Sequence, residues 1–216
     1  MARVVMDPEV RRNEIIDVAS ELFNKKGYEQ TAISDIVKKA NVAQGTFYYY
    51  FESKDDVLNA IIERWITEIK KALEQIVENR KMNALQKFFN ALLENGKISR
   101  KHQGMANYVH DKKNELFHLR LMRRTKLTVA PFLEKIIQQG IQEGTFHTQY
   151  PKEAAMAFLA ISDFLGHELR STQEETNRQL MYAIIDFTER ILITEQGTVL
   201  RIYESWQREM QKQIQN

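Results

Sequence analysis

The 216-residue sequence contains no cysteine, only three prolines and eight glycines, and no long apolar run. The absence of cysteine excludes disulfide bonds, thiolate metal sites and a cysteine nucleophile. The most apolar stretch, residues 154–165, is too short to span a bilayer and contains Asp163. The first residues, MARVVMDPEV, lack the apolar segment of a signal peptide. We therefore expect a cytoplasmic protein without membrane contact.

The sequence also lacks the short motifs of common catalytic and cofactor sites. It contains no GxSxG, no GxGxxG and no P-loop, and none of its five histidines forms HExxH or another metal-binding pair with a carboxylate. We expect no catalytic residues, no cofactor, no metal site and no enzyme activity. An enzyme with unrecognised catalytic residues remains an alternative, and it predicts turnover without binding to duplex DNA.

Charge is almost balanced over the chain, with a formal net charge of +2. The first 56 residues hold eight Lys and Arg against ten Asp and Glu, whereas residues 97–126 hold nine against two. Bulk charge alone would therefore place a polyanion site in the middle of the chain. A nucleic-acid site near the start must depend on local geometry instead.

Apolar residues recur at helical spacing along almost the whole chain, without sustained period-two alternation, which predicts an all-α fold. Asp7 and Pro8 are expected to begin the first helix, and Gly27 to end it. Thr31 is expected to cap a second, short helix, and Ser53 a long fourth helix. A third short helix should run from about residue 43 to residue 49. Two short helices joined by a tight turn are typical of a helix-turn-helix head.

Breaks in the helical pattern suggest two domains. Residues 1–52 form the predicted helix-turn-helix DNA-binding domain. Residues 53–216 form a larger helical body, and the long fourth helix joins it to the head. Residues 198–216 have one apolar face and predict an additional terminal helix.

The segment GTFYYYF, residues 45–51, places four aromatic residues in succession within the third helix. On a helical wheel Phe47, Tyr50 and Phe51 share the inward side. A glycine inside a helix costs about 1 kcal/mol relative to alanine, which is easier to understand if another backbone approaches closely there. Tyrosine and threonine hydroxyls can donate to phosphate, and glutamine can pair with adenine. The outward side comprises Gln44, Gly45, Thr46, Tyr48 and Tyr49.

Lys54 lies just inside the start of the fourth helix, where a cation opposes the positive end of the helix dipole. A bound phosphate would reverse that cost, because the helix start and the lysine would attract the same anion. Thr31, at the start of the second helix, offers a second such position.

The stretch TAISDIVKKANVAQGTFYYYFESKDDVLNAI, residues 31–61, resembles the DNA-binding signature of TetR-family transcriptional regulators. The resemblance implies a homodimeric repressor that binds a palindromic operator and releases it when a small molecule enters the body. Gln44 stands where Lys or Arg is common, and Ala43 where Ser is common, which leaves the operator preference open. The DNA contacts implied by position are Thr31, Gln44, Gly45, Thr46, Tyr48, Tyr49 and Lys54.

The same resemblance places an effector pocket among the body helices around residues 97–126. The cationic surplus of this segment suits an amphipathic anion, although ordinary core and a solvated outer face are the alternative interpretations. The expected pocket residues are Met105, Phe117, Leu121, Met122, Arg123 and Phe158.

Residues 154–168 are apolar on almost every side and, with residues 180–193, are the expected dimer interface. A DNA-binding scaffold without a ligand, such as a nucleoid or division factor, is an alternative to the ligand-controlled repressor. It predicts operator binding that no metabolite relieves. The expected interface residues are Ala157, Ile161, Phe164, Leu165, Ile184, Phe187 and Ile191.

Overall fold

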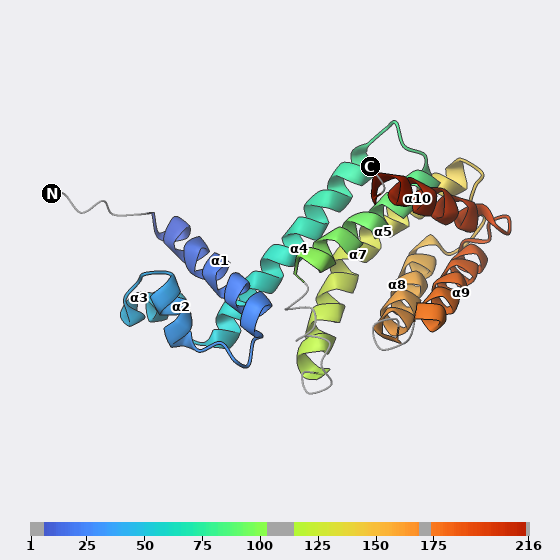
Figure 1. The fold of residues 1–216 in the computed structure, drawn as a ribbon. Helices are drawn as coiled ribbons and strands as arrows, with labels where there is room; N and C mark the ends of the chain where they lie inside the picture. The colour runs from blue at the N-terminus through green and yellow to red at the C-terminus, as the bar shows by residue number, and fades with distance from the viewer. Residues whose placement is uncertain (1–6, 103–114, 169–173, 215–216) are drawn as a thin grey trace. The chain divides into compact units, whose positions relative to one another are not determined.

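The computed structural model describes residues 7–102, 115–168 and 174–214 (Figure 1). These residues form helices and no strand, which confirms the all-α prediction. In chain order the helices are α1 (Pro8–Lys26), α2 (Ile33–Lys39), α3 (Gln44–Tyr50), α4 (Lys54–Glu78), α5 (Ala84–Lys101), α7 (Glu115–Gln142), α8 (Pro151–Glu168), α9 (Glu174–Leu192) and α10 (Thr198–Ile214).

Helix α1 begins and ends where the local sequence predicts. The Asp7 carboxylate accepts a hydrogen bond from the backbone N–H of Glu9 at 2.8 Å, and Pro8 is the first helical residue. Gly27 ends the helix with a φ of +86°, a left-handed conformation that glycine adopts without strain. The buried face of the helix consists of Ile15, Ile16, Ala19, Leu22 and Phe23.

Helices α2 and α3 form the predicted helix-turn-helix. They are separated by residues 40–43, and α2 packs against both α1 and α3. In the turn Asn41 adopts a φ of +52°, and the Val42 N–H donates to the Val37 carbonyl at 3.1 Å. Ile36 from α2 and Phe47 from α3 are completely buried. Their burial ties the two short helices to the head, because neither is long enough to be stable alone.

The prediction that Thr31 caps the second helix is wrong. Helix α2 begins at Ile33, with Ala32 in the capping position. The Thr31 hydroxyl is buried and donates to the Gly27 carbonyl at 2.8 Å. Carbonyls at the end of a helix lack intrahelical partners, so this acceptor at the end of α1 competes successfully for the hydroxyl.

Ser53 caps α4, as predicted. Its Oγ accepts a hydrogen bond from the Asp56 N–H at 3.1 Å, and the Asp56 carboxylate accepts one from the Glu52 N–H at 3.0 Å. One face of α4 is buried along its length, which keeps this long helix packed. That face includes Val57, Leu58, Ile61, Ile62, Trp65, Ile69, Leu73 and Ile76.

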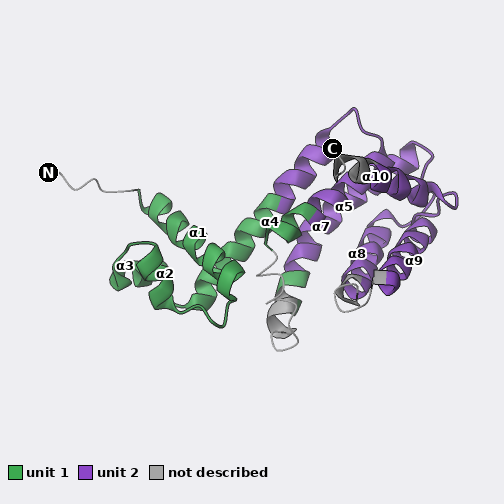
Figure 2. Ribbon diagram, viewed as in Figure 1, with its two compact units in different colours: residues 1–68, 97–122 green, residues 69–96, 123–216 purple. Residues whose placement is uncertain are grey.

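Packing divides the chain into two compact units (Figure 2). The first unit comprises residues 1–68 and 97–122, and the second comprises residues 69–96 and 123–216. Helix α4 contributes its first part to one unit and its last turns to the other. The functional boundary proposed after residue 52 stays a prediction.

The second unit has an aromatic core. The Phe88 ring contacts Phe146 and Phe158, with ring centroids 6.4 Å and 4.9 Å apart. Gly140 permits this packing, because a Cβ at that position would lie 2.0 Å from the Phe146 ring. Helix α8 packs against α9, and α9 packs against α10.

A buried carboxylate fixes the start of α10. Glu189 accepts hydrogen bonds from the backbone N–H groups of Gly197 at 2.8 Å, Val199 at 2.8 Å and Leu200 at 3.1 Å. The first N–H groups of a helix lack intrahelical acceptors and favour negative charge, so Glu189 stabilises this end. The predicted terminal helix is thus present, and its start is anchored to α9.

A polar network joins α4, α5 and α7 within the second unit. The buried Lys87 ammonium donates to the Val77 carbonyl at 2.6 Å and to Gln139 Oε1 at 2.8 Å. Gln139 donates in turn to Glu143 at 2.6 Å, and Glu143 accepts from the Ala84 N–H at 2.8 Å. The end of α4 and the start of α5 are therefore held by the same set of hydrogen bonds.

The described residues hold neither a membrane-spanning helix nor a cluster of metal ligands. In that part of the chain no helix combines the length and apolar character that crossing a bilayer requires. The same residues contain no group of three or more His, Asp or Glu side chains arranged to hold a metal ion.

Candidate nucleic-acid interface

Helix α3 turns one side into the head and the other outward. Phe47 is completely buried and Phe51 is 2% exposed, whereas Tyr48 is 50% and Tyr49 is 76% exposed. This is the division that helical periodicity predicts for the two sides. The other predicted contacts on this helix are exposed or half-buried: Gln44, Gly45 and Thr46.

The two exposed tyrosine rings are held by neighbouring rings of the same helix. Tyr49 meets Tyr50 edge to face with ring centroids 4.8 Å apart, and Tyr48 meets Phe47 in the same manner at 5.5 Å. Such pairs contribute about 0.5–1.5 kcal/mol beyond their buried area. The hydroxyls of Tyr48 and Tyr49 are therefore presented on oriented rings at the surface.

Gly45 is open to its surroundings. A Cβ added at this position would meet no atom within 4 Å, so the fold of this chain does not require glycine there. The cost of about 1 kcal/mol relative to alanine is therefore unexplained by internal packing. A glycine on the outward side of α3 lets another molecule approach the helix backbone closely.

Lys54 is engaged by the loop that follows α1. Its ammonium donates to the Tyr28 carbonyl at 2.9 Å and lies 4.0 Å from the centroid of the Tyr28 ring. The Tyr28 hydroxyl donates to the Asp55 carboxylate. Helix α4 thus begins with two side chains fastened to one tyrosine, and the Lys54 charge stays beside the helix start.

Tyr28 is the residue of this region that the sequence analysis missed. Its position one residue after the helix-ending Gly27 predicts a loop, and loop tyrosines are not ordinarily expected to be buried. The ring is 6% exposed and packs edge to face on Phe23 at 5.0 Å. The only sequence signal for the role of Tyr28 is the adjacent pair Lys54 and Asp55, which bind it in the fold. That pair lies 26 and 27 residues after Tyr28, so no local pattern connects them.

The Thr31 side chain is 1% exposed, which weighs against direct contact between its hydroxyl and DNA. Its assignment as a DNA contact stays a prediction. The hydrogen bond to Gly27 gives Thr31 a structural task, because it closes the loop between α1 and α2.

Ion pairs neutralise two lysines at the surface of the head. The Lys26 ammonium lies 3.2 Å from Asp35 and lowers the pKa of that carboxyl, and Lys39 lowers the pKa of Glu21 in the same way. Both pairs join α1 to α2. Helix α3 itself carries no acidic residue.

The predicted effector-pocket residues are divided between the two units, and each set is described separately. In the first unit Leu121 is buried and Met122 is half-buried. In the second unit Phe158 is buried and Arg123 is exposed. Met105 and the side chain of Phe117 lie outside the described residues. The pocket assignment stays a prediction.

The predicted interface residues lie on α8 and α9. Phe164 is 71% exposed and Phe187 is 41% exposed, so two large hydrocarbon side chains face outward from this helix pair. The interface assignment stays a prediction. The other members are half-buried: Ala157, Ile161, Leu165, Ile184 and Ile191.

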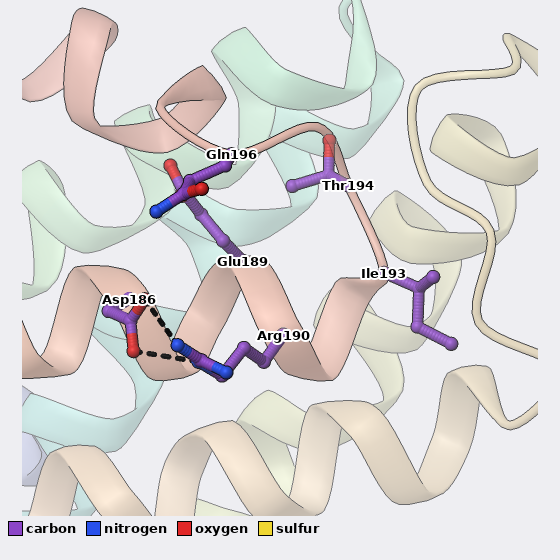
Figure 3. Close-up of a pocket in the computed structure, with 6 residues that line it drawn as sticks. All are labelled: Asp186, Glu189, Arg190, Ile193, Thr194 and Gln196. Atoms are coloured by element: carbon purple, nitrogen blue, oxygen red, sulfur yellow. Dashed lines mark hydrogen bonds and ion pairs between the residues drawn. The ribbon is translucent and has the colours of Figure 1, made fainter.

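A surface hollow of about 350 Å³ lies where α9 ends, away from the predicted pocket residues in sequence (Figure 3). Asp186 and Arg190 form an ion pair on its wall, with a shortest N–O distance of 2.8 Å. Glu189 also lines the hollow, but its carboxylate is occupied by the start of α10. The hollow therefore belongs to the joint between α9 and α10, and its charged side chains already have partners. It is lined by Asp186, Glu189, Arg190, Ile193, Thr194 and Gln196.

Two family models match separate parts of the chain. Residues 15–61 match the model of the bacterial regulatory proteins of the tetR family, and residues 97–183 match that of the tetracyclin repressor-like C-terminal domain. The first match contains α2, α3 and the start of α4. The second covers much of the body.

Individual proteins agree with these matches. The chain is 48% identical over 63 residues to the HTH-type transcriptional regulator YvdT of Bacillus subtilis, a match that covers 29% of this chain and 31% of that protein. It is 25% identical over 154 residues to the HTH-type transcriptional repressor KstR2 of Rhodococcus jostii, covering 69% of this chain and 74% of that one.

A solved TetR/AcrR-family regulator from Thermobifida fusca superposes with a TM-score of 0.62 at 22% identity, covering 85% of this chain and 97% of the other, and it supports the fold. The helix-turn-helix head, the larger helical body and the two family matches lead to one conclusion. The chain belongs to the TetR family of DNA-binding transcriptional regulators.

Proposed function

We propose that this protein is a homodimeric repressor that binds a palindromic operator and leaves it when a small molecule binds the body. The observation that carries the DNA-binding step is the outward side of α3. On that side Tyr48 and Tyr49 are exposed on either side of Gly45, where a Cβ would meet no atom within 4 Å. The buried Phe47 ring holds the opposite side of the helix in the head. Repression itself is supported by relatives that are named repressors, such as KstR2.

In this proposal the contacts to the operator divide into two kinds. Tyr48, Tyr49 and Thr46 donate to phosphate oxygens and fix the position of α3. Gln44, at the first turn of α3, reads a base edge in the major groove, with adenine as its natural partner. Lys54 and the start of α4 attract one further phosphate. Thr31 acts indirectly, by closing the loop that positions α2.

Two copies are required because a single recognition helix reads too few base pairs for a specific site. A two-fold dimer would place its two α3 helices about 34–36 Å apart, or a multiple of that distance. The exposed phenylalanines of α8 and α9 support these helices as the interface. Large exposed apolar patches commonly mark protein contacts.

The effector is proposed to be an amphipathic anion, and its binding to be the signal for release. The basic surplus of residues 97–126 supports this charge preference. We further propose that the protein acts in the cytoplasm, where bacterial DNA is found, and that it catalyses no reaction.

Selection of operator fragments from genomic DNA, followed by gel-shift titration, tests the DNA-binding step. The expected result is a palindromic site bound with two protomers per duplex. A reporter gene placed behind that site should be repressed by the protein. The scaffold alternative predicts binding to the same DNA that no compound in a metabolite screen relieves, whereas the repressor proposal requires at least one such compound.

A further inference from the structure

Two aromatic side chains of the first unit stack in its interior with polar atoms that lack partners. Trp65 of α4 is 7% exposed, and His102, directly after α5, is 8% exposed. Their ring centroids are 5.5 Å apart and the ring planes differ by 27°. Within the described part of the chain, neither Trp65 Nε1 nor His102 Nδ1 has a hydrogen-bond partner.

Unpartnered polar groups of this kind are destabilising. Leaving a buried donor or acceptor unsatisfied costs about 1–3 kcal/mol, and nearly all buried polar groups in native proteins have a partner. Two such atoms on one pair of stacked rings are therefore unusual. The apolar surroundings of Trp65 increase the cost, because Ile61 and Ile62 on the preceding turn of α4 are also buried.

The second nitrogen of His102 is already occupied. His102 Nε2 lies 3.2 Å from Glu68 Oε2, and Lys101 donates to the other oxygen of the same carboxylate at 2.8 Å. Burial alone raises the pKa of the Glu68 carboxyl. The hydrogen bonds from Lys101 and His102 together lower that pKa by a larger amount, so the net pKa lies below the usual value. The carboxylate therefore accepts a hydrogen bond from Nε2–H, which leaves Nδ1, on the other side of the ring, as the nitrogen without a partner among the described residues.

We propose that Trp65 Nε1 and His102 Nδ1 together recognise the carboxyl group of an apolar effector. This inference rests on the proposed function, because it assigns the polar contacts of the molecule that releases the operator. It assigns those contacts to two residues of the first unit and names the chemical group they bind.

The hydrogen-bonding rules of the two rings fit a carboxyl group. An indole N–H can only donate, so the ligand must offer an acceptor to Trp65. Nδ1 accepts a hydrogen bond from the O–H of a neutral carboxyl group, or donates one to a carboxylate when the imidazole is protonated. A carboxyl group therefore satisfies both nitrogens in either protonation state, whereas a quaternary ammonium group offers neither a donor nor an acceptor. A neutral hydroxyl group also fits these rules, and the basic surplus of residues 97–126 favours the acid over it.

Trp65 can report directly on this binding. The chain contains two tryptophans, and the second, Trp206, lies on α10 in the other unit, where it packs on Phe89 with ring centroids 6.0 Å apart. Trp206→Phe therefore leaves Trp65 as the only fluorescent indole. The probes are decanoate and phenylacetate as carboxylates, with decanol and decyltrimethylammonium as matched compounds without a carboxyl group.

In the Trp206→Phe protein at least one of the two carboxylates should change Trp65 emission saturably, and decyltrimethylammonium should not. Calorimetry on the full chain should then show that Trp65→Phe and His102→Phe each weaken binding of that carboxylate about tenfold, the loss of one strong hydrogen bond. Trp206→Phe, the same substitution in the other unit, should leave the affinity unchanged.

Equal binding of decanol and decanoate, binding of neither carboxylate, or unchanged affinity in both the Trp65 and His102 variants would overturn the inference. If either variant unfolds, the emission titration still decides, because it uses both native side chains. All of these measurements are made without DNA, so they test ligand binding separately from operator release. A wild-type protein that binds a carboxylate through Trp65 and His102 but never releases its operator would refute the proposed release while the binding assignment stands.

Discussion

Helix α3 and the pair α8 and α9 both expose large aromatic side chains, but the two surfaces differ in chemistry. On α3 the exposed rings are tyrosines, Tyr48 and Tyr49, each with a hydroxyl at its tip. Among the predicted interface residues of α8 and α9 they are phenylalanines, Phe164 and Phe187, which have no polar atom. Tyr182 on α9 is also 41% exposed, but its ring meets Tyr203 of α10 with ring centroids 6.4 Å apart. Exposed apolar area is therefore present on α3 and on the predicted interface, and the hydroxyls of α3 distinguish the two sets of residues.

The difference indicates two kinds of partner. A tyrosine ring can contact the sugar backbone of DNA while its hydroxyl donates to a phosphate oxygen. A phenylalanine ring gains only from leaving water, so it needs an apolar surface such as a second copy of the same helices. One surface thus suits a charged polymer and the other suits protein. Substitutions on α3 should leave the dimer intact, whereas loss of the dimer should also weaken operator binding, because a single recognition helix reads too few base pairs.

The largest effect is expected from the buried ring beneath the tyrosines. Phe47→Ala removes a completely buried phenylalanine and should destabilise the head by about 3–5 kcal/mol. Chemical denaturation followed by circular dichroism measures this loss, and duplex binding should disappear with it. Tyr49→Ala on the same helix is the matched control, because its ring is mostly exposed and its loss should leave the unfolding midpoint nearly unchanged.

The next largest effect should separate the two surfaces by assembly. Phe164→Glu places a charge in the proposed interface twice per dimer, and we expect the dissociation constant to rise at least about a hundredfold. Sedimentation at micromolar concentration should then show monomers that are still folded. Leu127→Glu is the control, because Leu127 is 70% exposed on α7, outside the proposed interface. A dimer that persists in the Phe164 variant would refute α8 and α9 as the interface.

How far the sequence predicts this structure depends on the distance between interacting residues. Asp7, Gly27 and Ser53 act on neighbours within a few residues, and their roles in starting or ending helices were predicted correctly. Thr31 was assigned as a cap on the same local reasoning, but its hydroxyl donates to the carbonyl of Gly27 at the end of the preceding helix. A local rule identifies a hydroxyl that can form a hydrogen bond, but it does not tell whether that hydroxyl accepts from the next helix or donates to the preceding one.

The candidate sites show the same limit more strongly. The outward side of α3 follows from helical periodicity, because Tyr48, Tyr49 and Phe47 belong to one short helix. The contact between Lys54 and Tyr28 spans 26 residues, and that between Glu68 and His102 spans 34. No periodicity connects such positions. They become neighbours only when α4 packs against the loop after α1 and against the end of α5, so the structure was needed to find them.

A smaller effect concerns the hydroxyl that distinguishes the two surfaces. Tyr49→Phe keeps the ring and removes only the proposed phosphate donor, so operator affinity should fall by about 0.5–1.5 kcal/mol, or about two- to tenfold. Gel-shift titration on the selected operator measures the change. Tyr150→Phe provides the control, since Tyr150 is 65% exposed in the body and should not affect DNA binding. An unchanged affinity in the Tyr49 variant would remove the hydroxyl from the DNA interface.

Lys54 allows the contribution of charge to be separated from that of packing. If its ammonium binds phosphate, Lys54→Ala should reduce the slope of log affinity against log salt by about one and weaken all duplexes alike. If it only holds Tyr28 in place, affinity and thermal stability should fall together while the slope stays the same. Gln44→Ala is the comparison, because loss of a base contact should change the preferred sequence and leave the salt slope unaltered.

The smallest expected effect is electrostatic and lies in the head, where Lys26 pairs with Asp35 across α1 and α2. The hydrogen bond from Lys26 is the first cause that lowers the pKa of Asp35, and the N–H of Ala32 adds to it. Because the folded state has the lower pKa, the stabilisation is fully present above the unfolded-state pKa of about 4 and is lost as pH falls through the folded value. Asp35→Asn should therefore flatten the acid side of the stability curve, measured as urea midpoints between about pH 7 and about pH 2. Lys26→Gln should produce a similar flattening, and the double variant should add little, because both substitutions remove the same pair. Additive losses in the double variant would show that the two side chains stabilise the head independently of each other.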